Sequence, residues 1–187
     1  MINVVLFEPE IPQNTGNIMR TCVATNAVLH LIKPLGFEID DKHLIRSGVN
    51  YIDKLKWYVY ENYEEFLSKN PNGKFYFLTR YGHKPPMKFD FSNKDENIYL
   101  VFGKESTGIP KNILKPHIDN CIRLPMSNNV RSLNLSNTVS IMVYEVLRQQ
   151  NYPNLYFDEP HKTKTEIEDF EDWKKEINFS FLNTKII

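Results

Sequence analysis

The first apolar run of the chain, Ile2–Phe7 (INVVLF), places the strongest limit on its fold. Every position except Asn3 is apolar, and Glu8-Pro9 ends the run. A strand that alternates apolar and polar residues has one face in water, whereas a nearly continuous apolar strand is buried on both faces. Such strands are typical of parallel sheets that helices cover on both sides. The run therefore predicts a buried strand of a parallel sheet.

Short β-branched and aromatic runs alternate with helical patterns along the following residues. Further strands are expected at His30–Lys33, Trp57–Tyr60, Phe75–Thr79, Ile98–Phe102 and Cys121–Leu124. Helices are expected at Asn14–Ala27, Asp41–Arg46, Tyr63–Ser68, Lys111–Lys115 and Leu135–Gln149. This alternation predicts a doubly wound α/β sheet that binds its ligands beyond the carboxyl ends of the strands.

Charge and cysteine content exclude several classes of protein. The chain carries 23 basic and 23 acidic residues, so a polybasic nucleic-acid binder is excluded and any RNA site must depend on local charge. No apolar run approaches the roughly 20 residues of a membrane span, and no secretory signal is recognisable at the N-terminus. Cys22 and Cys121 fit no zinc spacing and are typical of a reducing compartment. We expect a cytoplasmic protein without a metal site.

Charge is unevenly distributed, and the change predicts a boundary. Residues 158–187 hold eight acidic side chains and five lysines, while the preceding residues carry a small positive excess. The chain is therefore divided into a body, 1–157, and a C-terminal extension, 158–187. Within the extension, Ile167, Phe170, Trp173 and Ile177 form one apolar stripe at helical spacing. An amphipathic helix that packs on the body or on a partner subunit is predicted, with a disordered acidic tail as the alternative.

The first loop that could carry chemistry covers residues 8–20. Its two prolines favour an extended chain, Asn14 or Thr15 could cap a helix, and Gly16 leaves the first turn open. Arg20 follows one turn later and would point back toward the start of that helix. The pattern fits an anion site made of backbone N–H groups and Arg20, or a capped helix with a surface arginine.

Two further loops follow predicted strands. In the first, Glu105 lies between Gly103 and Gly108, and the Gly-Lys-Ser/Thr ending of a P-loop is absent. Its carboxylate could bind donors of a ligand or of a neighbouring loop, although an ordinary turn explains the pattern equally well. In the second, residues 124–137 are rich in Asn and Ser directly before a long apolar helix. Capping that helix requires only one or two of them, which favours a loop around a polar ligand.

Together these three loops resemble the motifs of the SPOUT (SpoU–TrmD) RNA methyltransferases in order and separation. The matching patterns are Asn14-x-Gly16-x-x-x-Arg20, Gly103-x-Glu105-x-x-Gly108, and Leu124-Pro125-Met126 followed by Ser132-Leu133-Asn134-Leu135-Ser136. The resemblance covers about residues 1–157, and it is closest to family members that modify the wobble ribose of tRNA. Any one motif would be weak evidence, whereas three in order are specific.

The resemblance implies a fold, a cofactor and partners. It implies an α/β fold with a mostly parallel sheet flanked by helices, whose C-terminal part forms a trefoil knot, an exception to the rule that chains are unknotted. It also implies S-adenosylmethionine as co-substrate without a metal, a homodimer, and 2′-O-methylation of nucleotide 34 in tRNA, with leucine tRNAs expected. The alternatives are a family member acting on another tRNA or rRNA position, and a non-catalytic RNA-binding protein.

The resemblance also assigns roles to individual residues. The cofactor-binding residues would be Leu78, Gly103, Gly108, Leu124, Ser132 and Asn134. The catalytic group would be Arg20, with Arg131 as a second candidate and with Asn14 and Glu105 holding the loops in place. Candidate RNA contacts in the body are Lys33, Lys42, Arg46, Lys54, Lys56, Arg80, Lys84 and Lys88. The five histidines are scattered and need no catalytic role.

Overall fold

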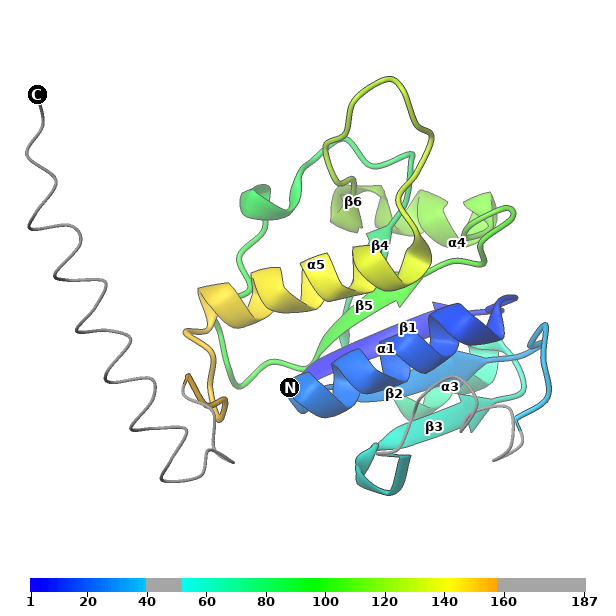
Figure 1. Ribbon diagram of the computed structural model, residues 1–187. Helices are drawn as coiled ribbons and strands as arrows, with labels where there is room; N and C mark the ends of the chain where they lie inside the picture. The colour runs from blue at the N-terminus through cyan, green and yellow to red at the C-terminus, as the bar shows by residue number, and fades with distance from the viewer. Residues whose placement is uncertain (40–51, 158–187) are drawn as a thin grey trace, which may run out of the picture. The chain divides into compact units, whose positions relative to one another are not determined.

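The computed structural model describes residues 1–39 and 52–157 and contains one six-stranded parallel sheet (Figure 1). The strand order is β3-β2-β1-β5-β4-β6. The strands are β1 (Ile2–Phe7), β2 (Val28–Ile32), β3 (Trp57–Tyr60), β4 (Lys74–Leu78), β5 (Ile98–Phe102) and β6 (Cys121–Ile122). Every residue of β1, β2 and β5 is buried, because these strands are covered on both faces. The prediction of a buried parallel strand at Ile2–Phe7 is confirmed, and this strand lies between β2 and β5.

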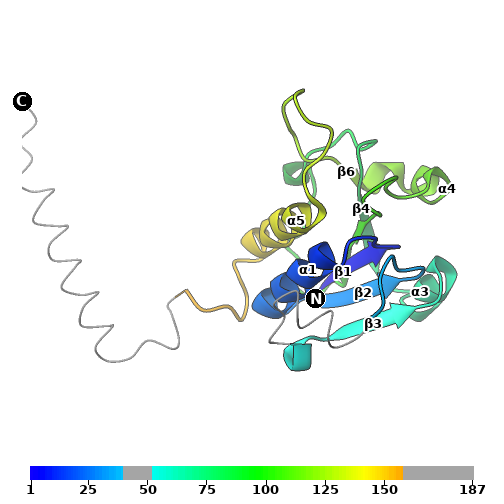
Figure 2. The same cartoon turned by 45° about the vertical axis from the view of Figure 1, so that its right-hand side comes forward.

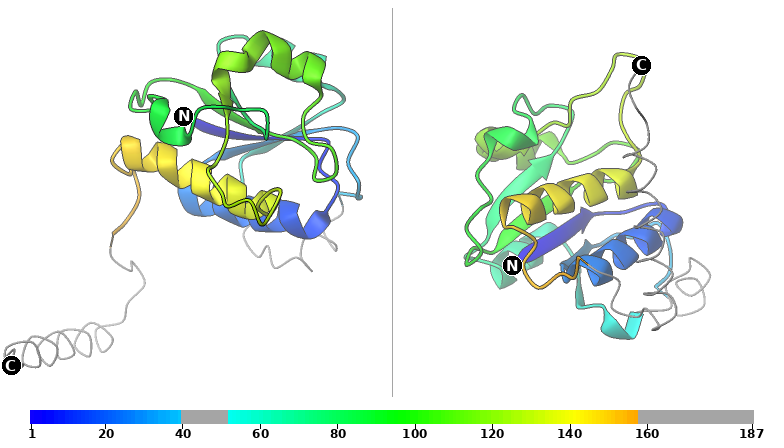
Figure 3. Two further views of the ribbon diagram at one scale, coloured as in Figure 1. Left: turned by 90° about the horizontal axis from the view of Figure 1, so that it is seen from above. Right: turned by 60° about the vertical axis from the view of Figure 1, so that its left-hand side comes forward.

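Helices cover both faces of the sheet. They are α1 (Pro12–Thr25), α3 (Tyr63–Lys69), α4 (Lys111–Leu114) and α5 (Leu135–Gln149), with short 3-10 helices η1 (Ile52–Lys54), η2 (Pro86–Lys88) and η3 (Lys115–Asn120). Helices α1 and α5 lie side by side on one face, as Figures 1 and 2 show. On the other face, Phe66 of α3 and Leu114 of α4 pack against Val5, Phe7 and Phe77 of the sheet. The view from above in Figure 3 shows the sheet between these two helical layers.

The register of the sheet brings four strand ends together. Leu6 pairs with Phe102, Phe102 with Leu78, and Leu78 with Ile122. The segments that follow β1, β5, β4 and β6 therefore leave the sheet at the same edge. In a parallel sheet this edge is where ligands bind.

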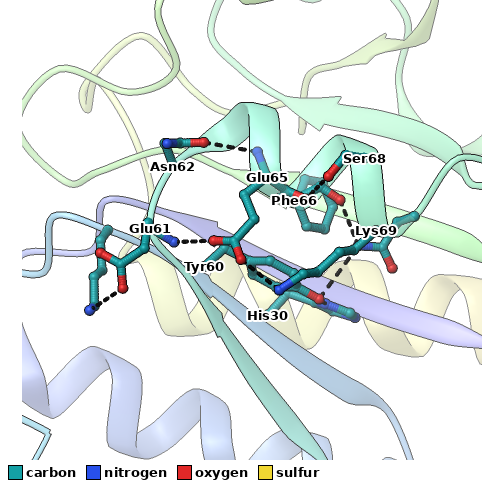
Figure 4. A network of polar contacts seen from close by, with 10 residues as sticks. His30, Tyr60, Glu61, Asn62, Glu65, Phe66, Ser68 and Lys69 are labelled. Carbon is teal, nitrogen blue, oxygen red and sulfur yellow. Dashed lines mark hydrogen bonds and ion pairs between the residues drawn. The ribbon is translucent and has the colours of Figure 1, made fainter.

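Asn3, the single polar residue of β1, belongs to a buried polar network, and Figure 4 shows the His30 and Tyr60 side chains of this network. The Nδ1 atom of His30 lies 2.8 Å from the Tyr60 hydroxyl, and its Nε2 atom lies 3.1 Å from Oδ1 of Asn3. The Asn70 side chain joins the network by donating a hydrogen bond to the Tyr60 hydroxyl at 3.4 Å, and it accepts one from the Tyr99 hydroxyl at 2.8 Å. Burial lowers the pKa of His30 to about 4, so its imidazole is neutral at physiological pH. We assign His30 a packing role.

The predicted fold class, a mostly parallel sheet flanked by helices, is confirmed, and the trefoil knot stays a prediction. Among the described elements, strand and helix ends differ from the predicted ones by at most two residues, as is usual for boundaries. The predicted helix Asp41–Arg46 and the extension 158–187 lie outside the described residues.

The body of the chain forms one compact unit, Met1–Pro153, and a second unit begins at Asn154. Of that second unit the structure describes only 154–157, where Tyr156 and Phe157 are exposed. Among the described residues, each helix is too short or too polar to span a lipid bilayer.

Candidate functional site

A cavity of about 680 Å³ opens where the four strand ends meet. Its wall includes Leu78 at the end of β4, Thr79 directly after it, Ile122 of β6, and Phe102 at the end of β5. The loops singled out from the sequence supply most of the remaining wall. Of the ten predicted site residues, all but Arg20 line this cavity: Asn14, Leu78, Gly103, Glu105, Gly108, Leu124, Arg131, Ser132 and Asn134. The volume is sufficient for a nucleoside-sized ligand.

Arg20 lies apart from this cavity. It is exposed on α1, nearly two turns after Asn14, whose side chain is buried at the cavity wall. Within a single chain, Arg20 therefore does not join the other predicted residues.

The loop after β5 doubles back tightly between its two glycines. The Gly108 N–H donates to the Lys104 carbonyl at 2.9 Å, and Gly108 has a φ of 77°. A Cβ atom added to Gly103 would lie 2.2 Å from the carbonyl carbon of Gly108 and 2.4 Å from the Ile109 nitrogen. Both contacts are with backbone, which cannot move aside without opening the loop. Gly103 is thus required for the close approach of the two loop ends.

The carboxylate of Glu105 joins this loop to the start of α1. It accepts hydrogen bonds from the backbone N–H of Glu10 at 2.9 Å, from that of Ile11 at 3.3 Å, and from the Asn14 side chain at 2.8 Å. A carboxylate at a helix N-terminus is also favoured by the helix dipole. Glu105 therefore holds the first loop against the second.

Two carboxylates of the first loop in turn contact residues of the loop that carries Glu105. Glu10 accepts hydrogen bonds from the N–H and the hydroxyl of Ser106, both at 2.8 Å, and these bonds lower the pKa of Glu10. Glu8 forms an ion pair with Lys104 at 2.5 Å. We call the contacts of Glu8, Glu10 and Glu105 between the two loops the carboxylate clasp.

Asn134 connects the third loop to the clasp. Its Nδ2 atom donates to Oδ1 of Asn14 at 2.9 Å, while Asn14 itself donates to Glu105. Oδ1 of Asn134 accepts from the backbone N–H and the hydroxyl of Ser136, at 2.9 and 2.7 Å, and so caps α5. All three loops are thus joined by direct side-chain hydrogen bonds around one cavity.

One prediction about the first loop is wrong. Asn14 and Thr15 do not cap a helix, because α1 already begins at Pro12 and Ile11 holds the cap position without a side-chain hydrogen bond. Proline fits the first turn of a helix, since its missing N–H would have had no partner there. Glu105, from a loop far away in the sequence, instead accepts hydrogen bonds from the N–H groups of Glu10 and Ile11, directly before the helix.

Arg80, Tyr81 and Arg123 also line the cavity. The sequence reasoning named Arg80 only as a candidate RNA contact, and it missed Tyr81 and Arg123. Tyr81 follows a predicted strand, so the rule used for the other loops would have found it. In the described ranges, 1–39 and 52–157, no group of three or more His, Cys, Asp or Glu residues could hold a metal ion.

Comparison with known proteins identifies relatives over most of the chain. The profile of the family described as SpoU rRNA Methylase matches residues 1–144. A protein of Bacillus subtilis named tRNA (cytidine(34)-2′-O)-methyltransferase is 51% identical over 154 residues, which cover 82% of this chain and 96% of that protein.

Two solved structures are similar to the fold. One, described as giving structural insights into the 2-OH methylation of C/U34 on tRNA, is 35% identical with a TM-score of 0.75, covering 81% of this chain and 97% of that one. The other, the SpoU methyltransferase AviRb of Streptomyces viridochromogenes in complex with the cofactor AdoMet, is 22% identical with a TM-score of 0.68. That match covers 81% of this chain and 58% of AviRb.

Proposed function

Because the chain belongs to the SpoU rRNA methylase family, we propose that it transfers a methyl group from S-adenosylmethionine to the ribose 2′-oxygen of nucleotide 34 in tRNA. One observation carries this proposal: three loops from separate parts of the chain are joined by hydrogen bonds around a cavity at the carboxyl ends of the strands. The names of the Bacillus subtilis protein and of the 35% identical structure support the choice of substrate.

The cavity residues fit the proposed cofactor. S-adenosylmethionine supplies a methyl group on a sulfonium centre. In the proposal Leu78, Gly103, Leu124 and Ser132 contact its nucleoside, with Gly108 and Asn134 shaping the two loops around it. The absence of a side chain at Gly103 keeps the loop ends close together there.

Methyl transfer to a ribose requires an alcohol oxygen to attack in line with the bond that breaks. The protein must therefore position the 2′-hydroxyl and assist the departure of its proton. A guanidinium stays protonated in proteins, so Arg20 is a poor general base. Its proposed role is to clamp an RNA phosphate that accepts the proton, and Arg131 at the cavity is the second candidate for that role. The clasp through Asn14 and Glu105 positions the loops.

The proposal is tested by methylation of an unmodified leucine tRNA transcript with isotope-labelled S-adenosylmethionine. Nuclease digestion and mass mapping should place the label at nucleotide 34. A transcript with 2′-deoxyribose at that nucleotide is the matched control and should accept no label. Label elsewhere in tRNA or in rRNA would favour another position within the family, and failure of S-adenosylmethionine to bind would favour a non-catalytic RNA-binding protein.

The protein is also proposed to act as a homodimer in the cytoplasm. An apolar groove of about 590 Å³ is lined by Met87 of η2 and by Ile141 and Tyr144 of α5. These side chains are 74%, 44% and 48% exposed, which is unusual for large apolar residues that lie together. A second copy that covers this groove would bury them. In the proposed dimer, Arg20 of each subunit acts at the cavity of the other subunit.

Replacing Ile141 with aspartate should convert the protein to a monomer, because the charge would be buried at the proposed subunit contact. Light scattering coupled to size exclusion would then give 22.1 kDa instead of twice that mass. Ile118→Asp is the matched control, since Ile118 on η3 is 51% exposed and lies outside the groove. A wild-type monomer, or an Ile141→Asp dimer, would contradict the proposal.

A further inference from the structure

Three cationic side chains gather around one tyrosine at the edge of the cavity. The guanidinium carbon of Arg80 lies 4.9 Å from the centre of the Tyr81 ring, and Nζ of Lys111 lies 5.3 Å from it. Arg80 also donates a hydrogen bond to the Tyr81 hydroxyl at 2.8 Å. Arg123 donates to the backbone carbonyl of Arg80 at 2.9 Å. We call these four residues the Tyr81 cluster.

The backbone under this cluster is fixed before any ligand binds. The Thr79 N–H donates to the Ile122 carbonyl at 3.0 Å, and the Arg123 N–H donates to the Lys84 carbonyl at 3.1 Å. Gly82 lies so close to β6 that an added Cβ would be 2.6 Å from the carbonyl carbon of Ile122. Cations held on such a frame lose less conformational entropy on binding than cations on a free loop.

The charges of the cluster are not neutralised within the described part of the chain. Other lysines there form ion pairs, such as Lys84 with Asp119 and Lys69 with Glu65. Arg80, Lys111 and Arg123 form none with a described acidic residue. The hydrogen bond from Arg80, together with the charges of Arg80 and Lys111, lowers the pKa of Tyr81, as expected where positive charge is concentrated.

This arrangement fits a phosphodiester. A guanidinium presents several N–H donors in a plane and matches phosphate oxygens, while a neighbouring ammonium adds charge. Arg80, Tyr81 and Arg123 line the same cavity as the proposed cofactor residues. An RNA backbone that delivers its ribose to this cavity must therefore pass near the cluster.

We propose that the Tyr81 cluster is a phosphate-binding site for the RNA backbone beside the nucleotide that is methylated. The inference rests on the proposed function, because it requires the substrate to be RNA. Tyr81 holds Arg80 in place, and Arg80, Lys111 and Arg123 contact the phosphate. The carboxylate of the cofactor is the other anion that could approach these cations, and the experiment separates the two.

The test uses the full chain with Arg80 and Lys111, both exposed, replaced together by alanine. Binding of the leucine tRNA transcript is followed by fluorescence anisotropy over a range of salt concentrations. The dissociation constant should rise roughly tenfold or more, and the slope of log K against log salt should become shallower by about one for each phosphate that the variant no longer neutralises. Calorimetric affinity for S-adenosylhomocysteine, and the melting temperature, should match those of the wild type.

Lys69→Ala is the matched control. It removes one positive charge, against two in the double variant, and Lys69 lies on α3 beside β3, at the opposite edge of the sheet from β6. Its tRNA affinity should stay at the wild-type level. A decrease in affinity that is as large in the control as in the double variant, per charge removed, would show an effect of net charge only and would overturn the inference.

Three further outcomes show whether the inference, the proposed function or both fail. If the wild type methylates nucleotide 34 and the double variant keeps full tRNA affinity, the cluster is not a phosphate site while the function stands. A loss of S-adenosylhomocysteine affinity in the double variant would assign the cluster to the cofactor carboxylate instead. A wild type that neither binds nor methylates tRNA would refute the function and this inference together.

Discussion

Replacing Gly103 with valine is expected to abolish the binding of S-adenosylmethionine and to lower methyl transfer by a hundredfold or more. The Cβ atom would come within 2.6 Å of three backbone atoms of Gly108 and Ile109, so the loop must open. A displacement of about an ångström at a reacting site is enough to cost roughly a hundredfold in rate. Isothermal calorimetry with S-adenosylmethionine measures the first effect, and initial rates on tRNA measure the second.

Gly108 provides a graded comparison in the same loop. An added Cβ meets nothing within 4 Å there, and only the φ of 77° disfavours a side chain. Asparagine tolerates such a backbone conformation better than other residues, so Gly108→Asn should reduce affinity far less than Gly103→Val. Folding of both variants is checked by circular dichroism. Unchanged affinity in a folded Gly103→Val protein would remove Gly103 from the cofactor site.

Arg20→Ala should lower methyl transfer by about ten- to a hundredfold while S-adenosylmethionine still binds. The loss of one charge-assisted hydrogen bond to a phosphate costs roughly 1.5–3 kcal/mol. Arg20 is exposed on α1 and does not line the cavity of its own chain, so cofactor affinity has no reason to change. The two quantities are measured by single-turnover kinetics and by calorimetry.

Arg20→Lys separates charge from geometry. Lysine keeps the positive charge but lacks the planar fork of donors, so it should recover only part of the rate. Full recovery would show that charge alone matters. If Arg20→Ala weakened cofactor binding as much as methyl transfer, the role of Arg20 would be structural.

The parts of this fold that depend on local pattern could be predicted from the sequence. Ile2–Phe7 is a short, nearly continuous apolar run, and Leu135–Gln149 has apolar residues at helical spacing. Both elements were predicted with the bounds that the structure has. The site loops could be predicted because they follow strands, where a parallel sheet collects its ligands. Asn134 caps its helix as its position before a long apolar segment suggested.

Contacts between distant segments could not be predicted in the same way. Glu105 accepts a hydrogen bond from the Ile11 N–H at the start of α1, and Glu10 accepts one from the Ser106 N–H. In each pair, the sequence around one residue does not indicate its distant partner. The Tyr81 cluster forms because β4 and β6 are adjacent and bring Arg80 and Arg123 together. Such pairings follow from the strand order, and that order could not be predicted from the spacing of residues along the chain.

The side-chain links between the three loops also determine when the site can exist during synthesis. Asn14 bonds to Glu105, 91 residues later, and to Asn134, 120 residues later. Strand β1 is made first, yet one of its two neighbours, β5, leaves the ribosome only after nearly a hundred further residues. Long-range pairings of this kind close late because the intervening chain must first be brought together. A nascent chain that stops before Asn134 contains all six strands but lacks the Asn134 side chain that joins the third loop to Asn14. Truncated translation products should therefore not compete with the complete protein for its cofactor.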